Sequence, residues 1–429
     1  MTTPRDPAVE DTTTLARETT HPYGWVIAAA GFLVTFTTIG SGRYLYPVIL
    51  PTMKDDLGLS YGLSGALASA IMVGYLVSCL VSGVLAVRLG FRVIIVLSTL
   101  ALGFAMAGQA ITSWYPVALF LMLVIGLGAG GAYIPTTGLV AAWFPAGRRG
   151  VFMSIVTEGA NLGILSTAIF GPMILLAHGG TGWRPAWVYF GLAAIGTGVA
   201  GLLAMRDRPP LSPGPPGQAA AGAGRASRNW SSVFRNRRML GLTAAYFCHG
   251  FFSIYPVFLF AFITRGLGET TEYAGRLWSL AGVMSALTIV VWGYLSDRWG
   301  RKQALIPCAA LLALGIILPV FRQDPAGLYL SAFLFGIAYV GPMTIITVAA
   351  GDLVGPAMAA AAMGLVTMGH GVGQMAGPAI GGQLIDITGS FYPGFVLATA
   401  AILAEIIIIV RLPMDRVGAA GLKEEKDVR

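Results

Sequence analysis

The chain has 429 residues, of which 56% are hydrophobic and only 11% are charged. Soluble domains average about 25% charged residues, so this composition excludes a water-soluble globular enzyme. A membrane-spanning helix needs about 20 mostly apolar residues, and a dozen such helices would use roughly 240. The composition therefore predicts many membrane spans joined by short loops.

Apolar runs separated by Gly, Pro and charged residues predict twelve spans. The first six lie near 24–50, 61–86, 93–112, 115–143, 149–176 and 186–205. The second six lie near 239–264, 273–296, 303–321, 327–351, 359–384 and 391–411. Helices and closed barrels alone satisfy their backbone in lipid, and these runs are too long and alternate too little for barrel strands. The predicted fold class is an all-α membrane protein with twelve transmembrane helices.

The formal charge of +8 gathers in alternate gaps between the apolar runs. These gaps hold Arg88 and Arg92, Arg148 and Arg149, Arg206 and Arg208, residues 225–238, and residues 298–302. Lys and Arg collect in the cytoplasmic loops of membrane proteins. We therefore expect an inner-membrane protein with both termini in the cytoplasm and membrane lipid around it. No basic face lies on a soluble domain, so no nucleic-acid partner is expected.

The polar segments divide the chain into two predicted bundles. Residues 1–22 read as a disordered cytoplasmic tail, and residues 207–238, rich in Pro, Gly, Ala and Ser, read as a flexible cytoplasmic linker. The bundles then cover 23–206 and 239–412, and 413–429 form a second cytoplasmic tail. The three cysteines fall inside apolar runs, so no disulfide framework is predicted.

The two halves repeat each other at a nearly constant offset. GVLAVRLG at 83–90 matches GYLSDRWG at 293–300, an offset of 210 residues that also pairs Gly126 with Gly336 and Gly163 with Gly373. At an offset of 209, the Tyr-Pro-Val of 46–48 matches that of 255–257. Such duplication predicts two pseudo-symmetric six-helix bundles related by an axis along the membrane normal.

The run GYLSDRWGRK at 293–302 joins the second and third predicted spans of its half. It resembles the loop motif of the major facilitator superfamily (MFS) of transporters, which implies the MFS fold. We expect Asp297 to attract the N-terminus of a neighbouring helix. Arg298, Arg301 and Lys302, with Arg88 of the first half, are expected to anchor to headgroups and pair across the halves as a cytoplasmic gate. In the first half Val87 replaces the Asp, so weaker charge interactions are predicted for that loop.

Within that superfamily, the first half is similar to monocarboxylate and oxalate/formate carriers. The similarity rests on an ordered set of motifs: YGWV at 23–26, GLGAGGAYIP at 126–135, WFP at 143–145, RRG at 148–150 and GANLG at 159–163. It implies a carrier for a small carboxylate. In the second half the match is mostly to the general superfamily pattern.

Two departures from related branches leave the substrate and the coupling open. Proton-linked relatives in the monocarboxylate branch carry an Asp and an Arg in the eighth span, whereas this chain has SALTIVVW at 285–292. The drug-efflux branch has its G-x-x-x-G-P-x-x-G-G motif in the fifth span, whereas here GQMAGPAIGG at 373–382 lies in the eleventh.

Arg43 is the leading candidate for substrate binding. It lies in the outer half of the first span, where relatives place a substrate-binding cation, and a charge at the centre of a span costs at least about 2.5–3.5 kcal/mol. A guanidinium matches a carboxylate with two parallel hydrogen bonds. At the offset of 209 its repeat partner is Phe252, so one anion would meet one cation. The alternative is that Arg43 extends towards the outer headgroups.

Glu158 in the fifth span is a candidate proton carrier or an internal partner of Arg43, since a buried Glu tends to hold its proton. A protonated Glu that merely bonds between packed helices is the alternative. Asn161 lies three residues further on the same helix face and is expected to share the cavity wall.

His249 and His370 are further candidates for proton coupling, each weighed against a packing role. Gln374 lies one turn after His370 and is expected at the substrate site, as are Tyr46, Tyr133 and Tyr255. Glu405 in the twelfth span is expected to face protein or to be protonated, without a function. No metal cluster, cofactor-binding loop or catalytic arrangement is found in the sequence.

These features predict a secondary transporter, not an enzyme, for a small organic anion such as a monocarboxylate. It would work by rocking one half against the other and would be driven by protons or by exchange with a counter-substrate. An exporter of hydrophobic or cationic compounds is the second hypothesis, in which Glu158 would bind the cation. A transporter-like receptor or assembly protein without flux is the third.

Overall fold

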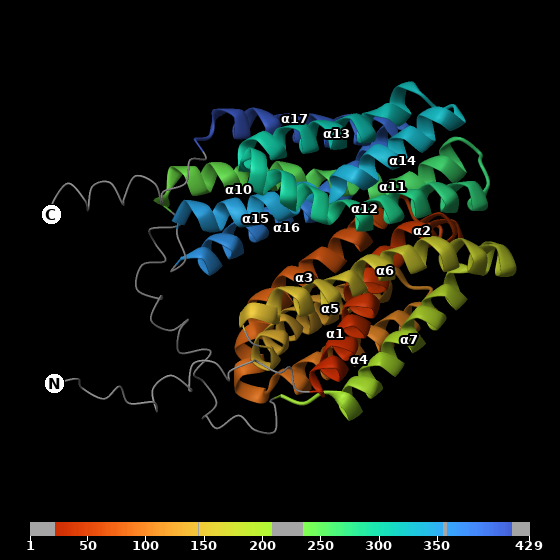
Figure 1. Cartoon of the computed structure of the whole chain (residues 1–429). Coiled ribbons are helices and arrows are strands. Elements are labelled where there is room, and N and C mark those ends of the chain that lie inside the picture. The colour runs from red at the N-terminus through yellow and green to blue at the C-terminus, as the bar shows by residue number, and fades with distance from the viewer. Residues whose placement is uncertain (1–21, 145, 208–234, 355–357, 414–429) are drawn as a thin grey trace, which may run out of the picture.

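The computed structural model describes residues 22–144, 146–207, 235–354 and 358–413. Within this part of the chain the secondary structure is helical, with no strand. Nearly all of the predicted tails at 1–22 and 413–429, and most of the predicted linker at 207–238, lie outside the described residues. The described helices form two bundles that lie against each other (Figure 1).

The first bundle opens with a helix that changes its hydrogen-bonding pattern midway. This span runs through α1 (Gly24–Thr35), the π-helical η1 (Phe36–Ser41) and α2 (Gly42–Asp56). The other helices of the bundle are α3 (Tyr61–Leu89), α4 (Phe91–Gln109), α5 (Tyr115–Trp143), α6 (Ala146–His178) and α7 (Trp183–Ala204), with the short η2 (Gly179–Thr181) before the last.

The second bundle repeats this order. Its first span runs through α10 (Arg237–Gly250), η4 (Phe251–Ser253), α11 (Ile254–Ala261) and η5 (Phe262–Gly266). Then follow α12 (Thr271–Trp299), α13 (Arg301–Phe321), the consecutive α14 (Pro325–Tyr339) and α15 (Gly341–Val354), α16 (Ala359–Thr388) and α17 (Tyr392–Arg411).

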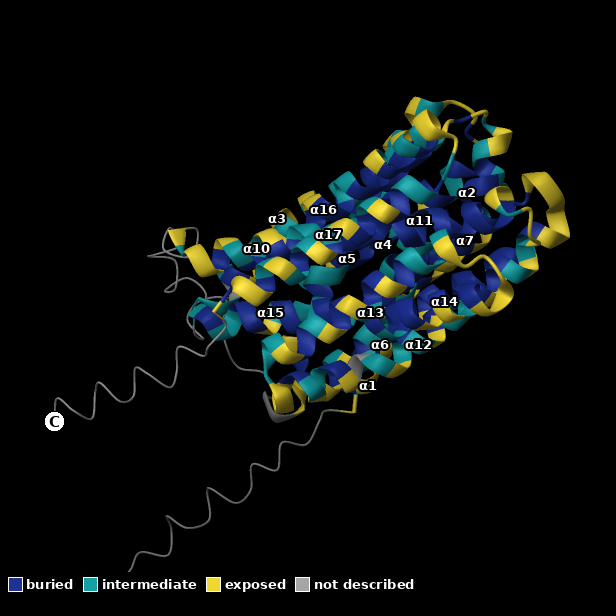
Figure 2. Cartoon of the chain, turned by 90° about the horizontal axis from the view of Figure 1, so that it is seen from above, coloured by how far each residue is buried: buried dark blue, intermediate teal, exposed yellow. Residues whose placement is uncertain are grey.

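Ten helices in the described residues are long and apolar enough to cross a membrane, and the bent α12 makes eleven. The 30-residue α16 occupies the place of the predicted eleventh span, so the count is consistent with twelve. Large apolar side chains such as Leu80, Phe104, Phe120 and Leu203 lie exposed on the outside of the bundles. Figure 2 shows exposed residues along the outward faces and buried residues between the helices. This outer face suits lipid, because hydrocarbon imposes no penalty on exposed apolar side chains.

The sequence repeat reappears as a repeat of contacts between helices. Gly163 on α6 lies against Gly40 and the Phe36 carbonyl, and Gly373 on α16 lies against Gly250 and the Phe247 carbonyl. A side chain at either glycine would overlap the backbone of the facing helix. Small residues let membrane helices approach closely, so these glycines set the packing of the first and fifth helices in each half.

The turn after the second helix of each half is also repeated. Gly90 and Gly300 adopt φ values of 96° and 99°, a region that favours glycine. Two residues further on, Arg92 bonds the Leu202 carbonyl, and Lys302 donates to the Leu412 carbonyl at 3.3 Å. Both basic side chains therefore tie the third helix of a half to its last helix.

The halves meet through the helix pairs α3–α16, α6–α12 and α2–α11. Along α3 and α16 the close approaches run from Gly371 against Leu76 to Gly382 against Tyr61. Beyond these points the two bundles diverge towards the Gly90 and Gly300 turns (Figure 1). We name the end with these turns the basic end, and the end where the halves touch, near Tyr61, the latch end.

Candidate functional site

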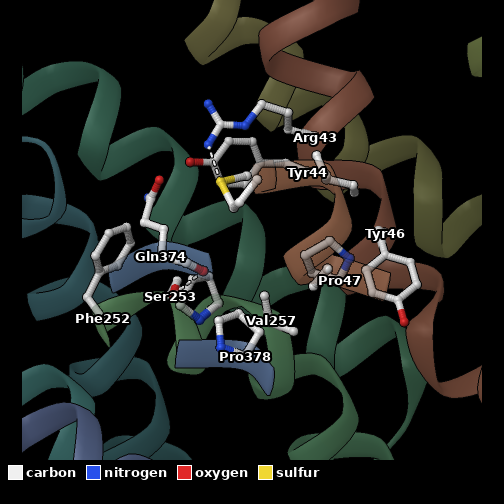
Figure 3. A pocket seen from close by; sticks show the side chains of 13 residues that line it. Arg43, Tyr44, Tyr46, Pro47, Phe252, Ser253, Val257, Gln374 and Pro378 are labelled. Carbon is white, nitrogen blue, oxygen red and sulfur yellow. Dashed lines mark hydrogen bonds between the residues drawn. The ribbon is translucent and has the colours of Figure 1, made fainter. Parts of the chain in front are cut away.

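A small cavity lies between the halves, near the middle of the first helix of each. It offers about 50 Å³ to the centres of water molecules. Since one water needs at least about 10–15 Å³ by this measure, the cavity suits a molecule of a few heavy atoms. Its wall is formed by Arg43, Tyr44, Tyr46, Pro47, Ala68, Ile71, Met72, Phe252, Ser253, Pro256, Val257, Gln374 and Pro378 (Figure 3).

Local backbone chemistry positions Arg43 at this cavity. The π-helical turn η1 ends two residues before it, and such turns widen a helix locally. Pro47 lies inside α2 four residues later, so the Arg43 carbonyl cannot accept the usual helical hydrogen bond. Pro256 stands in the same relation to Phe252 on the opposite wall. Both halves thus loosen the first helix where it meets the cavity.

The Arg43 guanidinium is surrounded by neutral groups. Nη2 donates to the Met72 sulfur at 3.2 Å, and the guanidinium carbon lies 4.4 Å from the centre of the Tyr75 ring. A thioether is a weak acceptor, and Nε is buried without a hydrogen-bond partner. No carboxylate of the described residues lies within salt-bridge distance of Arg43. The positive charge in the cavity therefore lacks an ionic partner from this part of the protein.

The second half supplies neutral polar groups to the same cavity. Gln374 extends from α16, opposite Arg43 of α2, and Ser253 lies beside it (Figure 3). The Ser253 hydroxyl donates to the Gly250 carbonyl at 2.8 Å. Tyr44, next to Arg43, shares a hydrogen bond with Tyr339 of α14, and this bond joins the halves. The cavity thus combines one cation from the first half with amide and hydroxyl groups from the second.

The three predicted site tyrosines and Gln374 take different places. Tyr46 contributes to the cavity wall, but its hydroxyl donates to the Ser64 carbonyl at 2.8 Å. Tyr133 bonds to Thr157 and is within electrostatic range of Arg43, yet it is not among the lining residues. The Tyr255 hydroxyl lies 2.5 Å from the Ser331 hydroxyl, inside the second bundle. Among these four residues, only Gln374 lines the wall with a side chain that is not hydrogen-bonded within the described residues.

Glu158 and Asn161 lie together on α6, as the helical spacing predicts. The Asn161 amide donates to the Glu158 carboxylate at 3.1 Å. Neither residue lines the cavity, and no ion pair joins Glu158 to Arg43 in the described structure. The hypothesis of an internal Glu158–Arg43 pair therefore has no counterpart in this conformation.

The structure brings together His249, His370 and Glu405, which the sequence had left separate. Nδ1 of His249 lies 3.0 Å from Oε2 of Glu405, and both side chains are completely buried. The His370 ring stacks on Tyr246 with 4.1 Å between ring centres and lies 5.4 Å from the His249 ring. The His249–Glu405 pair lies in the second bundle, and the ring of Phe252 separates it from the cavity.

The predicted gate residues bond within the second half. Arg301 contacts Asp297 and donates to Asp352 at 3.0 Å, and Lys302 donates to the Val410 carbonyl at 2.6 Å. Arg298 donates to the Tyr294 hydroxyl at 3.0 Å, while Arg88 is exposed at the end of α3. In the described residues none of these bonds reaches the other half. Their role as a gate stays a prediction, because the halves are apart at the basic end.

At the latch end, charged groups do join the halves. Asp386 of α16 accepts from the backbone N–H groups of Tyr61 and Gly62 at 2.8 and 2.7 Å. A carboxylate at the N-terminus of α3 is stabilised by the helix dipole. Arg265 also donates to Asp55 at 2.8 Å. These contacts join the two halves at the latch end.

Several wall residues have no signal in the sequence. Met72 and Ser253 read as ordinary span residues, Pro378 appears only within the GQMAGPAIGG motif, and Tyr44 beside Arg43 carries no prediction of its own. The proline four residues after Arg43, repeated in the second half, is the signal that could have marked both walls. Within the described residues no group of three or more His, Cys, Asp or Glu side chains could hold a metal ion.

These features define a class of protein: a membrane carrier of two repeated six-helix bundles with a small cavity between them. The chain belongs to the major facilitator superfamily of transporters. Residues 35–410 match the family described as "Uncharacterised MFS-type transporter YbfB".

Relatives and solved structures agree with this assignment. The chain is 25% identical to the probable sulfoacetate transporter SauU of Cupriavidus necator, covering 86% of this chain and 90% of that protein. It is 25% identical to human monocarboxylate transporter 11, covering 91% and 83%. It is also 24% identical to a putative tartrate transporter of Agrobacterium vitis, covering 84% of each. The nucleoside transporter NupG shares the fold, with a TM-score of 0.74 at 14% identity over 91% of this chain and 99% of that one. An inward-facing bacterial homologue of human Spinster gives 0.71 at 17% identity over 91% and 95%.

Proposed function

We propose that this protein is a secondary transporter that moves a small organic anion, with a carboxylate bound at Arg43, across the inner membrane. The observation that carries the proposal is the half-buried guanidinium at the cavity wall, whose Nε is buried without a hydrogen-bond partner and whose neighbours are a thioether and phenol rings. Keeping a charge within a membrane span is costly unless a partner compensates it. A carboxylate offers two oxygens in the geometry that a guanidinium prefers.

The size and chemistry of the cavity narrow the substrate class. About 50 Å³ accommodates a compact anion, and Ala68, Ile71 and Val257 provide an apolar wall for a short carbon chain. Gln374 and Ser253 can bond a second polar group, such as a hydroxyl, a sulfonate or the second end of the molecule. The names of the similar proteins (sulfoacetate, monocarboxylate and tartrate transporters) support this class. A bound anion would contact Arg43 of one half and Gln374 of the other.

The transport cycle exposes this cavity to each side in turn. By the distribution of Lys and Arg, the basic end faces the cytoplasm, and both termini lie there. The latch end then faces outward and is closed here by Asp386 and by the Arg265–Asp55 pair. In the alternate state, Arg88, Asp297, Arg298, Arg301 and Lys302 would approach one another and close the cytoplasmic end. Protons or a counter-substrate would drive the cycle, with Glu158, His249 and His370 as the candidate proton carriers.

The second hypothesis, export of cationic compounds, needs an acidic group in the cavity. The lining residues include one Arg and no Asp or Glu. This observation favours an anion over a cation as the substrate.

Uptake into proteoliposomes tests the proposal. Wild-type protein is assayed with labelled acetate, lactate, sulfoacetate and tartrate, beside Arg43→Gln. Loss of a charge-assisted bidentate contact of about 3 kcal/mol should reduce transport roughly 100-fold. Arg276→Gln is the matched control, since Arg276 lies exposed near the start of α12, 3.9 Å from Glu272 and away from the cavity wall. Unchanged carboxylate transport by Arg43→Gln would remove the anion site, and transport of organic cations instead would favour the second hypothesis.

A further inference from the structure

The second half contains a buried carboxylate–imidazole pair that takes no part in anion binding as described above. Oε2 of Glu405 on α17 lies 3.0 Å from Nδ1 of His249 on α10, and both side chains are 0% exposed. The other atoms, Oε1 of Glu405 and Nε2 of His249, are buried without a hydrogen-bond partner. Buried polar atoms normally have a hydrogen-bond partner. Two such atoms without a partner in one pair destabilise the fold, so the pair calls for a functional explanation.

No cation of the described residues is in direct contact with the pair. Tyr246 and Cys248 face it from α10, Cys308 from α13 and His370 from α16. From η4 the neighbour is the ring of Phe252, and on α11 the Tyr255 hydroxyl is bonded to Ser331. No Lys or Arg of the described residues lies within 4.0 Å of Glu405. Without a bound proton, the pair would carry one negative charge in an apolar interior, which is costly.

The repeat indicates that the scaffold does not need these polar residues. At the offset of 210, Glu405 corresponds to Ile195 and His249 to Ile39, and His370 corresponds to Ala160. The first half builds the same helix arrangement, with the same glycine contacts, from these apolar side chains. The polar cluster is therefore an addition to the second half, and not a requirement of the fold.

The pair is close enough to the cavity to sense its charge. Phe252, a wall residue, has its ring centre 5.2 Å from that of His249 and 6.0 Å from that of His370. Charges interact strongly over such distances where water is excluded. His370 is 6% exposed, whereas His249 and Glu405 are 0% exposed, so His370 is the member of the cluster nearest to solvent.

We propose that the Glu405–His249 pair is the proton-binding site of this transporter and that it takes up one proton when an anion binds beside Arg43. The inference rests on the proposed anion transport and identifies its driving ion and the residues that hold it. In the empty state the charge of Arg43 offsets the negative charge of the deprotonated pair. A carboxylate at Arg43 cancels that positive charge, so the pair then binds a proton from water by way of His370. One H⁺ and one carboxylate enter together and leave together, and no other bond changes.

Two modes of transport in proteoliposomes test this assignment. In exchange, the same labelled anion (lactate, sulfoacetate or tartrate, whichever the wild type exchanges) is present on both sides, and no net proton movement is needed. In driven uptake, an inward pH gradient accumulates the anion against its own gradient. Glu405→Gln cannot release a proton, so we expect exchange within about threefold of wild type and at least a tenfold loss of driven accumulation. Glu272→Gln, an exposed Glu on α12, is the matched control and should retain both modes.

The outcomes separate this inference from the proposed function. Wild-type protein that exchanges none of the anions contradicts the proposed function itself. Exchange without accumulation by the wild type, or full accumulation by Glu405→Gln, overturns the proton site alone. If Glu405→Gln does not fold, a second measurement uses His249→Gln. Wild-type protein in weakly buffered detergent solution should take up about one proton when the anion is added, as read by a pH-sensitive dye, and His249→Gln should take up none while still binding the anion. Equal proton uptake by the variant would also overturn the proposal.

Discussion

The two halves of this transporter share a scaffold but differ in where they place charge. The first half presents one arginine to the cavity and has apolar residues at Ile39 and Ile195. The second half presents neutral groups to the cavity and buries an acid–imidazole pair at the corresponding positions. The glycine contacts between the first and fifth helices are the same in both.

This difference shows how a duplicated fold can separate its tasks. Packing is repeated, because every membrane helix bundle must let its backbones approach. Polar chemistry is not repeated, because a single small anion can be held by a single guanidinium. In our proposal, the second half then holds the Glu405–His249 pair, which binds a proton when the anion binds.

The largest expected effect comes from breaking the shared packing. We expect Gly163→Leu and Gly373→Leu to destabilise the protein by about 3 kcal/mol or more each, because a side chain would overlap the backbone of the facing helix. Thermal unfolding in detergent, followed by light scattering or a thiol-reactive dye, measures this. Gly364→Leu is the control, since Gly364 lies on α16, as Gly373 does, and has open space beside it. If only one of the two glycines proves sensitive, the halves do not share this contact in solution.

A smaller effect is expected when the second half is given the residues of the first. In the double variant His249→Ile with Glu405→Ile, the free energy of unfolding should equal or exceed that of the wild type, because apolar residues often replace buried pairs without cost. Glu405→Ile alone should lose about 1–3 kcal/mol, since it leaves the imidazole nitrogens unpartnered. The two changes are therefore non-additive. The measurement is a double-mutant cycle of thermal stability, beside pH-driven uptake, which the double variant should lack. Strong destabilisation of the double variant would mean that the pair is structural.

The smallest effect concerns a loop in which the halves differ. Asp324 caps α14, whereas the corresponding Trp114 of the first half gives α5 no side-chain cap. A hydrogen bond from Arg322 lowers the pKa of the Asp324 carboxyl from 3.8 to about 2. Because the folded pKa lies below the unfolded value, the stabilisation is present above about pH 4 and is lost as the pH falls towards 2.

Asp324→Asn keeps the capping oxygen and removes the ion pair. We expect the Tm at pH 7 to fall by less than about 2 °C, since exposed pairs contribute little, and the difference from wild type to vanish near pH 2. Differential scanning fluorimetry at pH 7, 4 and 2.5 measures this. A difference that grows at low pH would have the wrong sign for an ion pair.

Much of the scaffold could be predicted from the residues in order. The all-helical class and the paired bundles are confirmed, because length and apolarity suffice to identify a membrane helix. Helix ends were less accurate: the fifth span was placed at 149–176, whereas α6 covers Ala146–His178. Loops at the interface mix polar and apolar residues, so hydropathy alone does not locate a helix end.

Less of the candidate site could be predicted. Arg43 was found because a charge inside an apolar run is conspicuous, and Gln374 was found through its place one turn after His370. Tyr255 was expected at the cavity, whereas its hydroxyl is bonded to Ser331 within the second bundle. Which face of a helix meets the cavity depends on the rotation of that helix, and spacing along one chain does not define it.

The sequence by itself determined the number and order of the apolar segments, their duplication and the single cation in the first span. These are local properties, set by composition and by the length that lipid demands. Tertiary structure alone decided that Glu405 meets His249 across 156 positions, that Asp386 caps α3, and that neutral groups surround Arg43. Such pairings arise when helices distant in the chain pack side by side, since the approach of two backbones is a property of the assembled bundle.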